Sequence, residues 1–342
     1  MNAQWQAFLT ARGASFDAIG AADFNAPKTP VAPASLHALM QEGLIRFTGD
    51  DAQAFLHGQL SCDVNALGAG QAQYGSYCTP QGRMLASFVL WRDDAGYWMA
   101  LPRALVEATR KRLAMFILRS KVLATDASDT HVLLGVSGAR AHAVLSEVFP
   151  AVPDAPLSHV SHAESTVLKL AADRFEISAP VAEAQTLWDA FAARATPVGA
   201  AAWEWLRIRE GIASITPETR EQFVPQMANL DAIGGVSLSK GCYPGQEIVA
   251  RMHYLGKLKQ RMYRANIVGT PPPKPGDKLY SAAFGAQSCG MIVNAAPSPQ
   301  GGHDVLAVMQ IESAGRGDVR LSDPGGPALN LLDLPYAVTA AA

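Results

Sequence analysis

The segment from Lys240 to Arg251 brings reactive side chains together with turn-forming residues and reads K-G-C-Y-P-G-Q-E-I-V-A-R. Cys242 can act as a nucleophile once its thiol loses a proton. We predict a helix from about Pro244 to Met252, because proline suits the first helical position, where an N–H would be unpaired anyway. Cys242 would then lie just ahead of a helix N-terminus and near Lys240, and both features favour the thiolate. The alternative is a tight loop with Cys242 as a small buried side chain.

The expected elements place this segment late in an α+β chain. Strands are predicted at 44–47, 74–79, 83–91, 97–101 and 122–125, with helices at 51–60 and 103–118. Turns at Pro80–Gly82 and Asp93–Gly96 join neighbouring strands. Helices on one face of an antiparallel sheet form an α+β lobe.

The order of elements then begins again, without a convincing sequence repeat. The second set comprises strands at 131–136, 166–170 and 175–178 and helices at 139–148, 181–194 and 201–209. Short strands at 259–268, 278–280, 288–294, 305–311 and 319–321 follow, as in a small barrel or sandwich. We therefore expect four parts: an N-terminal extension with an extended Pro-rich connector (1–35), a first lobe (36–128), a second lobe that carries the motif (129–256), and a C-terminal β-barrel (257–342).

Composition sets the class of protein. The chain has 342 residues, of which 49% are hydrophobic and 17% charged, as in a globular protein of two or three domains. A net charge of −2 gives no overall attraction to nucleic acid or to an anionic membrane. We find no apolar run of the roughly 18 residues that span a bilayer. The N-terminus lacks the pattern of a secretory signal, so we expect a cytoplasmic protein.

The cysteines do not form a metal-binding pattern. They are far apart and include no C-x-x-C pair: Cys62, Cys78, Cys242 and Cys289. This spacing argues against a zinc ribbon or a ferredoxin-type cluster, and we expect free thiols in a reducing compartment. We interpret the three cysteines outside the motif as core residues.

Three further groups of residues have less specific interpretations. His57 is expected to be a hydrogen-bonded histidine at a helix end, and His253 and Tyr254 can line the site of the motif. One cluster is basic and contains Arg110, Lys111, Arg112, Arg119 and Lys121. It can bind tRNA or an acidic protein, although a solvated helix face is the more common explanation for such a run.

The motif also carries a resemblance. K-G-C-Y-x-G-Q-E-x-x-A-R resembles the signature of the YgfZ-type folate-binding proteins, which are related to the glycine-cleavage T-protein (aminomethyltransferase) and linked to iron–sulfur cluster assembly or repair. The likeness extends through 55–64, 80–83, 222–230, 234–237 and 253–257, and covers most of the chain from about residue 44. It implies two related, ferredoxin-like α+β lobes, a small C-terminal β-barrel and a folate site near the middle.

The resemblance implies tetrahydrofolate, or a one-carbon derivative of it, as the cofactor. The expected binding set offers cations, an aromatic face and hydrogen-bonding groups: Lys240, Tyr243, Gln246, Glu247, Arg251 and Arg209. Arginine can grip a carboxylate with two parallel hydrogen bonds. For Glu247 and Arg251 the alternative is an i,i+4 surface ion pair, worth only about 0.3–0.5 kcal/mol.

Two departures from the T-protein pattern bear on activity. Ala86 and Ser87 stand where the resemblance places the catalytic acid, and neither can act as a carboxylate. Arg209 stands where the pterin-binding glutamate is expected, and Glu210 follows one residue later, about 100° around a helix. These departures argue against aminomethyl transfer, and they leave open whether the chain turns over a substrate.

Three functions therefore remain open. The first is a tetrahydrofolate-binding accessory protein for iron–sulfur cluster assembly or repair, including that of tRNA-modifying enzymes, with Cys242 reactive. The second is a folate-dependent aminomethyl or methyl transferase, and the third is a binding protein without turnover. Cys242 can be a reactive thiol, a transient ligand of iron, or a structural residue. We expect a monomer with iron–sulfur proteins as clients and with no membrane or direct nucleic-acid partner.

Overall fold

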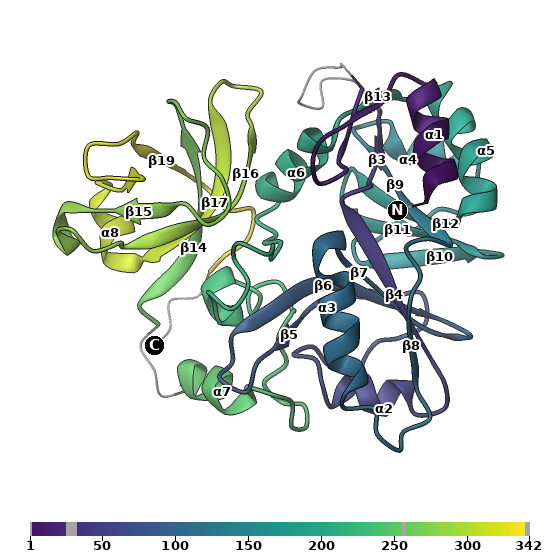
Figure 1. Ribbon diagram of the computed structural model, residues 1–342, viewed down its shortest axis with the longest axis horizontal. Helices are drawn as coiled ribbons and strands as arrows, with labels where there is room; N and C mark the ends of the chain where they lie inside the picture. Colours follow the sequence, from purple (N-terminus) through teal and green to yellow (C-terminus); the bar gives the residue numbers. More distant parts are fainter. Residues whose placement is uncertain (1, 25–32, 255–257, 339–342) are drawn as a thin grey trace. The chain divides into compact units, whose positions relative to one another are not determined.

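The computed structural model describes residues 2–24, 33–254 and 258–338 (Figure 1). The chain separates into two compact units, and neither is a continuous stretch of sequence. The first unit comprises residues 1–56, 64–73 and 88–203, and the second comprises residues 57–63, 74–87 and 204–342. The predicted Pro-rich connector falls largely on residues 25–32, outside the described residues.

One sheet of the first unit contains the strands predicted for the first lobe. Its order is β5-β6-β7-β4-β8, and β5 and β6 continue along the chain into the second unit. The strands are β4 (Glu42–Thr48), β5 (Ala72–Cys78), β6 (Met84–Asp93), β7 (Gly96–Pro102) and β8 (Leu123–Asp126), with helices α2 (Ala52–His57) and α3 (Arg103–Ala114). The β6–β7 hairpin closes with Asp93 opposite Gly96, as predicted.

The other large sheet of the first unit has the order β10-β11-β12-β9-β3-β13. Its strands are β3 (Ser35–Ala38), β9 (His131–Ser137), β10 (Ser158–His162), β11 (Ser165–Ala171), β12 (Arg174–Pro180) and β13 (Thr196–Val198). A two-stranded ribbon of β1 (Ser15–Phe16) and β2 (Ala22–Asp23) and helices α1 (Ala3–Ala11), α4 (Ala141–Ser146) and α5 (Val181–Ala192) complete this part. Helices α1 and α5 lie side by side (Figure 1), and Trp5 meets Trp188 edge-on with ring centroids 5.9 Å apart.

The second unit contains a curled six-stranded half-barrel with the order β18-β15-β16-β17-β14-β19. Its strands are β14 (Gln260–Ile267), β15 (Lys278–Tyr280), β16 (Gly290–Pro297), β17 (His303–Gln310), β18 (Arg320–Leu321) and β19 (Leu329–Leu332). The helices of this part of the chain are α6 (Ala200–Arg209), η1 (Pro225–Ala228), α7 (Gln246–Tyr254), η2 (Ala282–Phe284) and α8 (Ile311–Arg316). Ile267, Ile292 and Val305 are among the buried residues of its core.

The α+β class with a C-terminal β-structure is confirmed, and the differences lie at element ends and in short strands. Helix α3 ends at Ala114 rather than 118, and the strand expected at 305–311 ends at Gln310, where α8 follows. The prediction missed β3 and β13, which pair in parallel with Thr196 opposite Ser35. Such strands are defined by a distant partner, so their own sequence gives little signal. No described helix has the length and apolarity to cross a membrane. The four-part division of the chain stays a prediction.

Candidate functional site

The motif folds as a turn followed by a helix. Helix α7 begins at Gln246 and ends at Tyr254, so it starts two residues later than predicted. The reason is Gly245, whose φ of +86° is left-handed and therefore unsuited to a helix interior. The Gln246 N–H instead donates to the Tyr243 carbonyl at 3.1 Å. Cys242 lies four residues before the helix, and because the helix dipole acts mainly within its first turn, the predicted activation by the N-terminus is weakened.

The start of α7 packs against the turn between β5 and β6. A Cβ atom on Gly245 would lie 2.5 Å from the Thr79 carbonyl oxygen and 2.6 Å from the Gly82 Cα. A Cβ on Gly82 would lie 3.2 Å from the Cβ of Ile248. The Gly82 N–H closes the turn by donating to the Thr79 carbonyl at 2.9 Å. Sequence analysis predicted this turn but not its contact with the motif.

Lys240 holds the motif to the last residue of α2 and to the segment that follows it. Its Nζ donates to the carbonyls of His57, of Leu60 at 2.6 Å and of Cys62 at 3.1 Å. Lys240 is 8% exposed, and burial lowers the pKa of its ammonium. An ammonium has three N–H donors, and these three carbonyls use all of them. The structure therefore gives Lys240 an anchoring role, and its contact with a folate carboxylate stays a prediction.

Tyr243 also packs inward. Its ring is buried and lies under the Lys240 Nζ, 5.0 Å from the centroid. Its phenol oxygen has no hydrogen-bond partner among the described residues, and burial raises the pKa of the phenol. The predicted stacking face is therefore covered. Cys62 and Cys78 are buried nearby, where burial raises the pKa of each thiol to about 12, and their interpretation as core residues is confirmed.

Cys242 is exposed, so the alternative that made it a buried side chain is wrong. The residue before it faces His57, since a Cβ on Gly241 would lie 3.8 Å from the His57 Nε2. The other ring nitrogen, Nδ1, lies 3.3 Å from the Asp63 Oδ1. Burial is the main cause that lowers the pKa of His57, and the charge of Lys240 lowers it further. The charge of Asp63 raises the pKa and so acts against both. His57 is therefore neutral near pH 7 and can accept a proton.

His57 and Asp63 lie beside the motif, and the sequence analysis placed neither of them in the candidate site. His57 was expected to be a hydrogen-bonded helix-end histidine rather than a base, and Asp63 received no role. The sequence did contain a signal for these two residues, because both lie in the 55–64 segment, which is one of the segments that carry the family resemblance. Nothing in the local pattern, however, indicated that this segment meets the motif more than 170 residues further along the chain.

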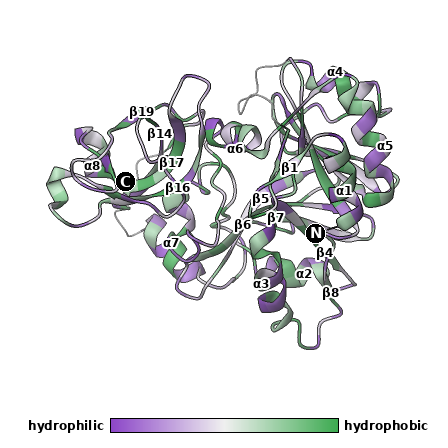
Figure 2. Ribbon diagram, turned by 45° about the horizontal axis from the view of Figure 1, so that its top comes forward, coloured by the Kyte–Doolittle hydropathy of each residue, from purple (hydrophilic) through white to green (hydrophobic). Residues whose placement is uncertain are grey.

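Two of the remaining predicted residues of α7, Glu247 and Arg251, face outward, and Gln246 is half-buried. Glu247 and Arg251 are exposed, and no ion pair joins them in the part of the chain that the structure describes. The Gln246 side chain donates from Nε2 to the Lys240 carbonyl at 3.2 Å. Val249 is the buried residue of this helix, and Figure 2 shows both hydrophobic and hydrophilic residues along α7. Glu247 and Arg251 thus remain available to a ligand.

Arg209 lies at the end of α6, with its guanidinium carbon 5.3 Å from the centroid of the Trp205 ring. Among the described residues, no hydrogen bond, ion pair or ring contact joins Arg209 to the 240–251 segment. Its membership of one site with the motif stays a prediction.

The positions aligned with the transferase acid are structural. Ala86 and Ser87 are both buried in β6. The Ser87 hydroxyl donates to the Ala213 carbonyl at 3.2 Å and accepts from the Ile215 N–H at 3.0 Å. Ser87 therefore fastens the 213–215 segment to the strand, a task that a hydroxyl fulfils with one donor and one acceptor.

The fold and this arrangement define the class of protein. Residues 31–238 match the family model of the GCVT N-terminal domain. The structure superposes on the glycine cleavage system aminomethyltransferase T from Bartonella henselae with a TM-score of 0.78, at 19% identity over 97% of this chain and 96% of that one. At that identity the likeness establishes the shared fold.

Curated relatives narrow the family. The chain is 32% identical to the tRNA-modifying protein YgfZ of Yersinia enterocolitica over 310 residues, which are 90% of this chain and 94% of the relative. It is also 32% identical to the protein of that name from Sodalis glossinidius, over 311 residues and the same shares of both chains. The chain belongs to the YgfZ family, and the resemblance noted in the motif is confirmed.

Proposed function

We propose that the chain is a tetrahydrofolate-binding accessory protein that supports iron–sulfur proteins, including those that modify tRNA, through a reactive thiol at Cys242. The observation that carries the proposal is the position of Cys242: an exposed thiol on a loop that is anchored on both sides. Lys240 anchors the loop before the thiol, and the contact between Gly245 and Gly82 anchors it after the thiol. Relatives named as tRNA-modifying proteins over 90% of the chain support the biological setting.

His57 supplies the chemistry in this proposal. Its neutral imidazole takes the proton of the Cys242 thiol, and the Asp63 carboxylate, 3.3 Å from Nδ1, stabilises by its charge the imidazolium that forms. The resulting thiolate is the form that attacks an electrophile or becomes oxidised. Three uses of that thiolate remain open: attack on a client, acceptance of a one-carbon unit, and redox sensing.

The exposed side of α7 suits a folate. Arg251 can hold a carboxylate of the glutamate tail with two parallel hydrogen bonds, and Glu247 can accept hydrogen bonds from the pterin. Tetrahydrofolate would supply the one-carbon unit when bound. In the revised site Lys240 and Tyr243 act indirectly, because they hold the loop that carries Cys242. Gln246 supports the same loop, and Arg209 is kept as a candidate contact.

The alternative, a folate-dependent aminomethyl or methyl transferase, is less well supported. Ser87 occupies the place of the transferase acid, and both of its hydrogen bonds go to the backbone of the 213–215 segment. A serine in that setting has no proton-shuttle role. The proposal therefore assigns the chemistry to the thiol and not to β6.

The test is the rate of Cys242 alkylation by iodoacetamide, followed by mass spectrometry from about pH 5 to pH 10, with and without tetrahydrofolate. The three buried cysteines are internal controls. We expect Cys242 to react fastest and tetrahydrofolate to slow its reaction several-fold, with Arg251→Gln removing the protection. If saturating tetrahydrofolate left the alkylation rate of Cys242 unchanged, the thiol and the folate would not share a site, and this proposal would be refuted.

A further inference from the structure

A second exposed feature lies in the first unit, in residues 115–123, which comprise the loop between α3 and β8 and the first residue of β8. Four of its side chains are large, apolar and exposed: Met115 by 64%, Phe116 by 45%, Leu118 by 88% and Leu123 by 60%. Single apolar residues on a surface are ordinary, but a group of four on one short loop is the usual mark of an interaction site. We call this segment the 115–123 loop.

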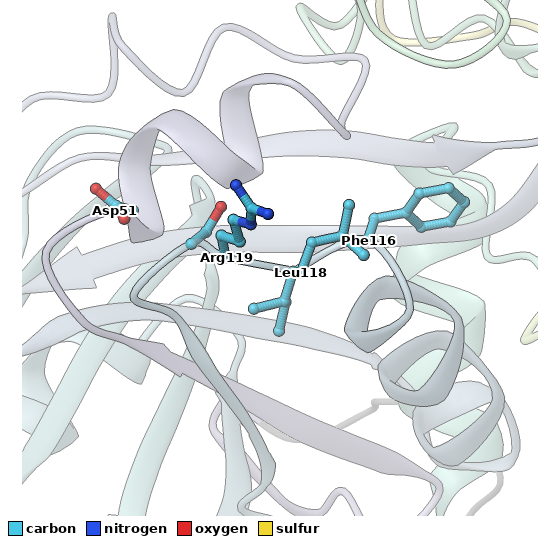
Figure 3. Close-up of a pocket in the computed structure, with 6 residues that line it drawn as sticks. Asp51, Phe116, Leu118 and Arg119 are labelled. Atoms are coloured by element: carbon cyan, nitrogen blue, oxygen red, sulfur yellow. The ribbon is translucent and has the colours of Figure 1, made fainter.

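The 115–123 loop borders a hollow. Its volume is about 740 Å³, and it is lined by Asp51 and residues 116–120. Figure 3 shows Phe116 and Leu118 projecting from the loop in different directions, with Arg119 between them and Asp51. The hollow is shallow and wide open to solvent, so a protruding side chain of a partner can reach it without any opening of the loop.

The backbone of the loop is strained at its most exposed residue. Leu118 has a φ of +45°, in the left-handed region that residues with a side chain disfavour. Because Leu118 is 88% exposed, burial within this chain does not offset that cost. Strain that packing does not explain is more often retained at sites of function.

Charge indicates what kind of partner fits. The stretch from residue 109 to residue 123 contains five cations and no acidic residue: Arg110, Lys111, Arg112, Arg119 and Lys121. Glu107 pairs with Arg110 and Lys111, and Asp50 pairs with Lys121. Arg112 and Arg119 have no ion pair among the described residues. Glu107 and Asp50 neutralise part of this charge and Asp51 lines the hollow, so the positive charge that remains comes mainly from Arg112 and Arg119 and favours an acidic ligand.

We propose that the 115–123 loop docks an acidic, amphipathic segment of a partner protein. Apolar side chains of the partner enter the hollow and cover Phe116 and Leu118, while its carboxylates meet Arg112 and Arg119. The aliphatic side chains favour a protein over nucleic acid, whose bases stack on aromatic and guanidinium groups. This surface goes beyond the proposed function, because it involves neither Cys242 nor folate.

The test uses the full chain and three labelled synthetic peptides. The first peptide repeats Glu-Glu-Leu-Leu, which places the leucines on one face of a helix. The second has Lys in place of Glu, and the third has Ser in place of Leu. We expect fluorescence anisotropy to show that the first peptide binds at least about tenfold more tightly than the others, and that added salt weakens its binding.

Variants locate the binding. Leu118→Ser combined with Phe116→Ser, and separately Arg119→Glu, should each weaken binding of the first peptide by about tenfold. Because these side chains are exposed, the variants should fold, which thermal unfolding checks. Matched controls are Ile311→Ser, an exposed apolar residue on α8, and Lys274→Glu, an exposed cation; both should bind as the parent does. Cys242→Ser should also bind normally, which keeps this proposal separate from the proposed function.

Several outcomes would overturn the docking proposal. Equal affinity for all three peptides would remove its chemical basis, and so would binding that the loop variants do not change. Binding of unmodified tRNA or of phosphatidylserine vesicles at the loop, without binding of the acidic peptide, would assign the surface to another class of partner. A concentration-dependent dimer that the Leu118 variant abolishes would assign it to a second copy of the chain.

Discussion

Lys240 and Cys242 are two residues apart, and the structure gives them opposite environments. Lys240 is buried and satisfied by three carbonyls, whereas Cys242 is exposed. The same short motif therefore contains an anchor and a reactive group. A polar residue of the motif can therefore serve the fold and not a ligand, as Lys240 does.

Replacing Lys240 tests the anchor. Lys240→Met keeps the aliphatic length but leaves three carbonyls without their donor, and we expect the free energy of unfolding to fall by about 2–3 kcal/mol. Urea denaturation measures this change. Lys259→Met, at an exposed lysine of the same unit, should change stability by less than about 0.5 kcal/mol. Similar values for both variants would contradict the anchoring role.

Replacing His57 tests the activation of the thiol. We expect His57→Gln to slow alkylation of Cys242 by about tenfold at pH 7 and to move the half-maximal rate to higher pH, because the proton acceptor is lost. Asp63→Asn should have a smaller effect in the same direction. His253→Gln, at an exposed histidine on α7, is the control. An unchanged pH profile in His57→Gln would exclude His57 as the base, even if stability changed.

His37 predicts how stability depends on pH. It is fully buried, its Nε2 lies 2.8 Å from the Ser137 hydroxyl, and burial followed by the nearby Arg174 lowers its pKa from 6.5 to about 3. Between those values the unfolded chain binds a proton that the folded chain does not. His37 therefore makes the folded state lose stability as pH falls from 6.5 towards 3, by on the order of 1 kcal/mol per pH unit.

The measurement is urea denaturation at several pH values for the parent and for His37→Gln, which can keep a hydrogen bond to Ser137. The variant should show a shallower loss of stability below pH 6.5. Because His131 and His159 also have lowered pKa values, the difference between the two proteins, and not the slope of either alone, isolates His37. Parallel pH curves would refute this contribution.

At the scale of elements, the site depends on how closely a turn approaches a helix. The β5–β6 turn and the start of α7 meet through two glycines, Gly82 and Gly245, both with positive φ. Local sequence explains each glycine as a turn residue. The contact between them explains why neither position has space for a side chain.

Gly245→Ala tests this contact. The added methyl group would meet backbone atoms at 2.5–2.7 Å in addition to the strain at φ +86°, so we expect a loss of at least about 2–3 kcal/mol. Gly234→Ala is a matched control, since Gly234 has φ +75° and nothing within 4 Å of the added atom. Thermal unfolding should show a clearly larger loss of stability for Gly245→Ala than for Gly234→Ala. Equal losses would mean that backbone strain alone explains the effect and that the contact with Gly82 contributes nothing.

At the scale of the whole molecule, the half-barrel is fastened to the segment that leads into the motif. Arg261 on β14 forms two hydrogen bonds with Asp231, at 2.7 and 2.9 Å. The Asn294 amide accepts from the Ser214 N–H and donates to its carbonyl, and Asn229 donates to the Met262 carbonyl. These are all contacts within the second unit, and they couple the barrel to the region that carries Cys242.

Arg261→Met tests this coupling. It leaves Asp231 without the guanidinium in a mostly buried position, and we expect a loss of about 3 kcal/mol, with faster hydrogen exchange across residues 225–250. Arg316→Met removes an exposed i,i+4 pair with Glu312 and should cost less than about 0.5 kcal/mol. If exchange rises only in the half-barrel, the two parts unfold independently and the coupling is refuted.

The sequence by itself determined the α+β class, the strands of the main hairpins, the buried cysteines outside the motif and the family. It could do so because apolar spacing, turn residues and a long literal motif are local properties of the chain. Only the tertiary structure decided which motif residues are free. The partners of Lys240 are carbonyls about 180 residues away, His57 meets the loop of Cys242, and Gly82 meets Gly245. Such pairings depend on where distant segments of the chain meet, and no local pattern specifies that.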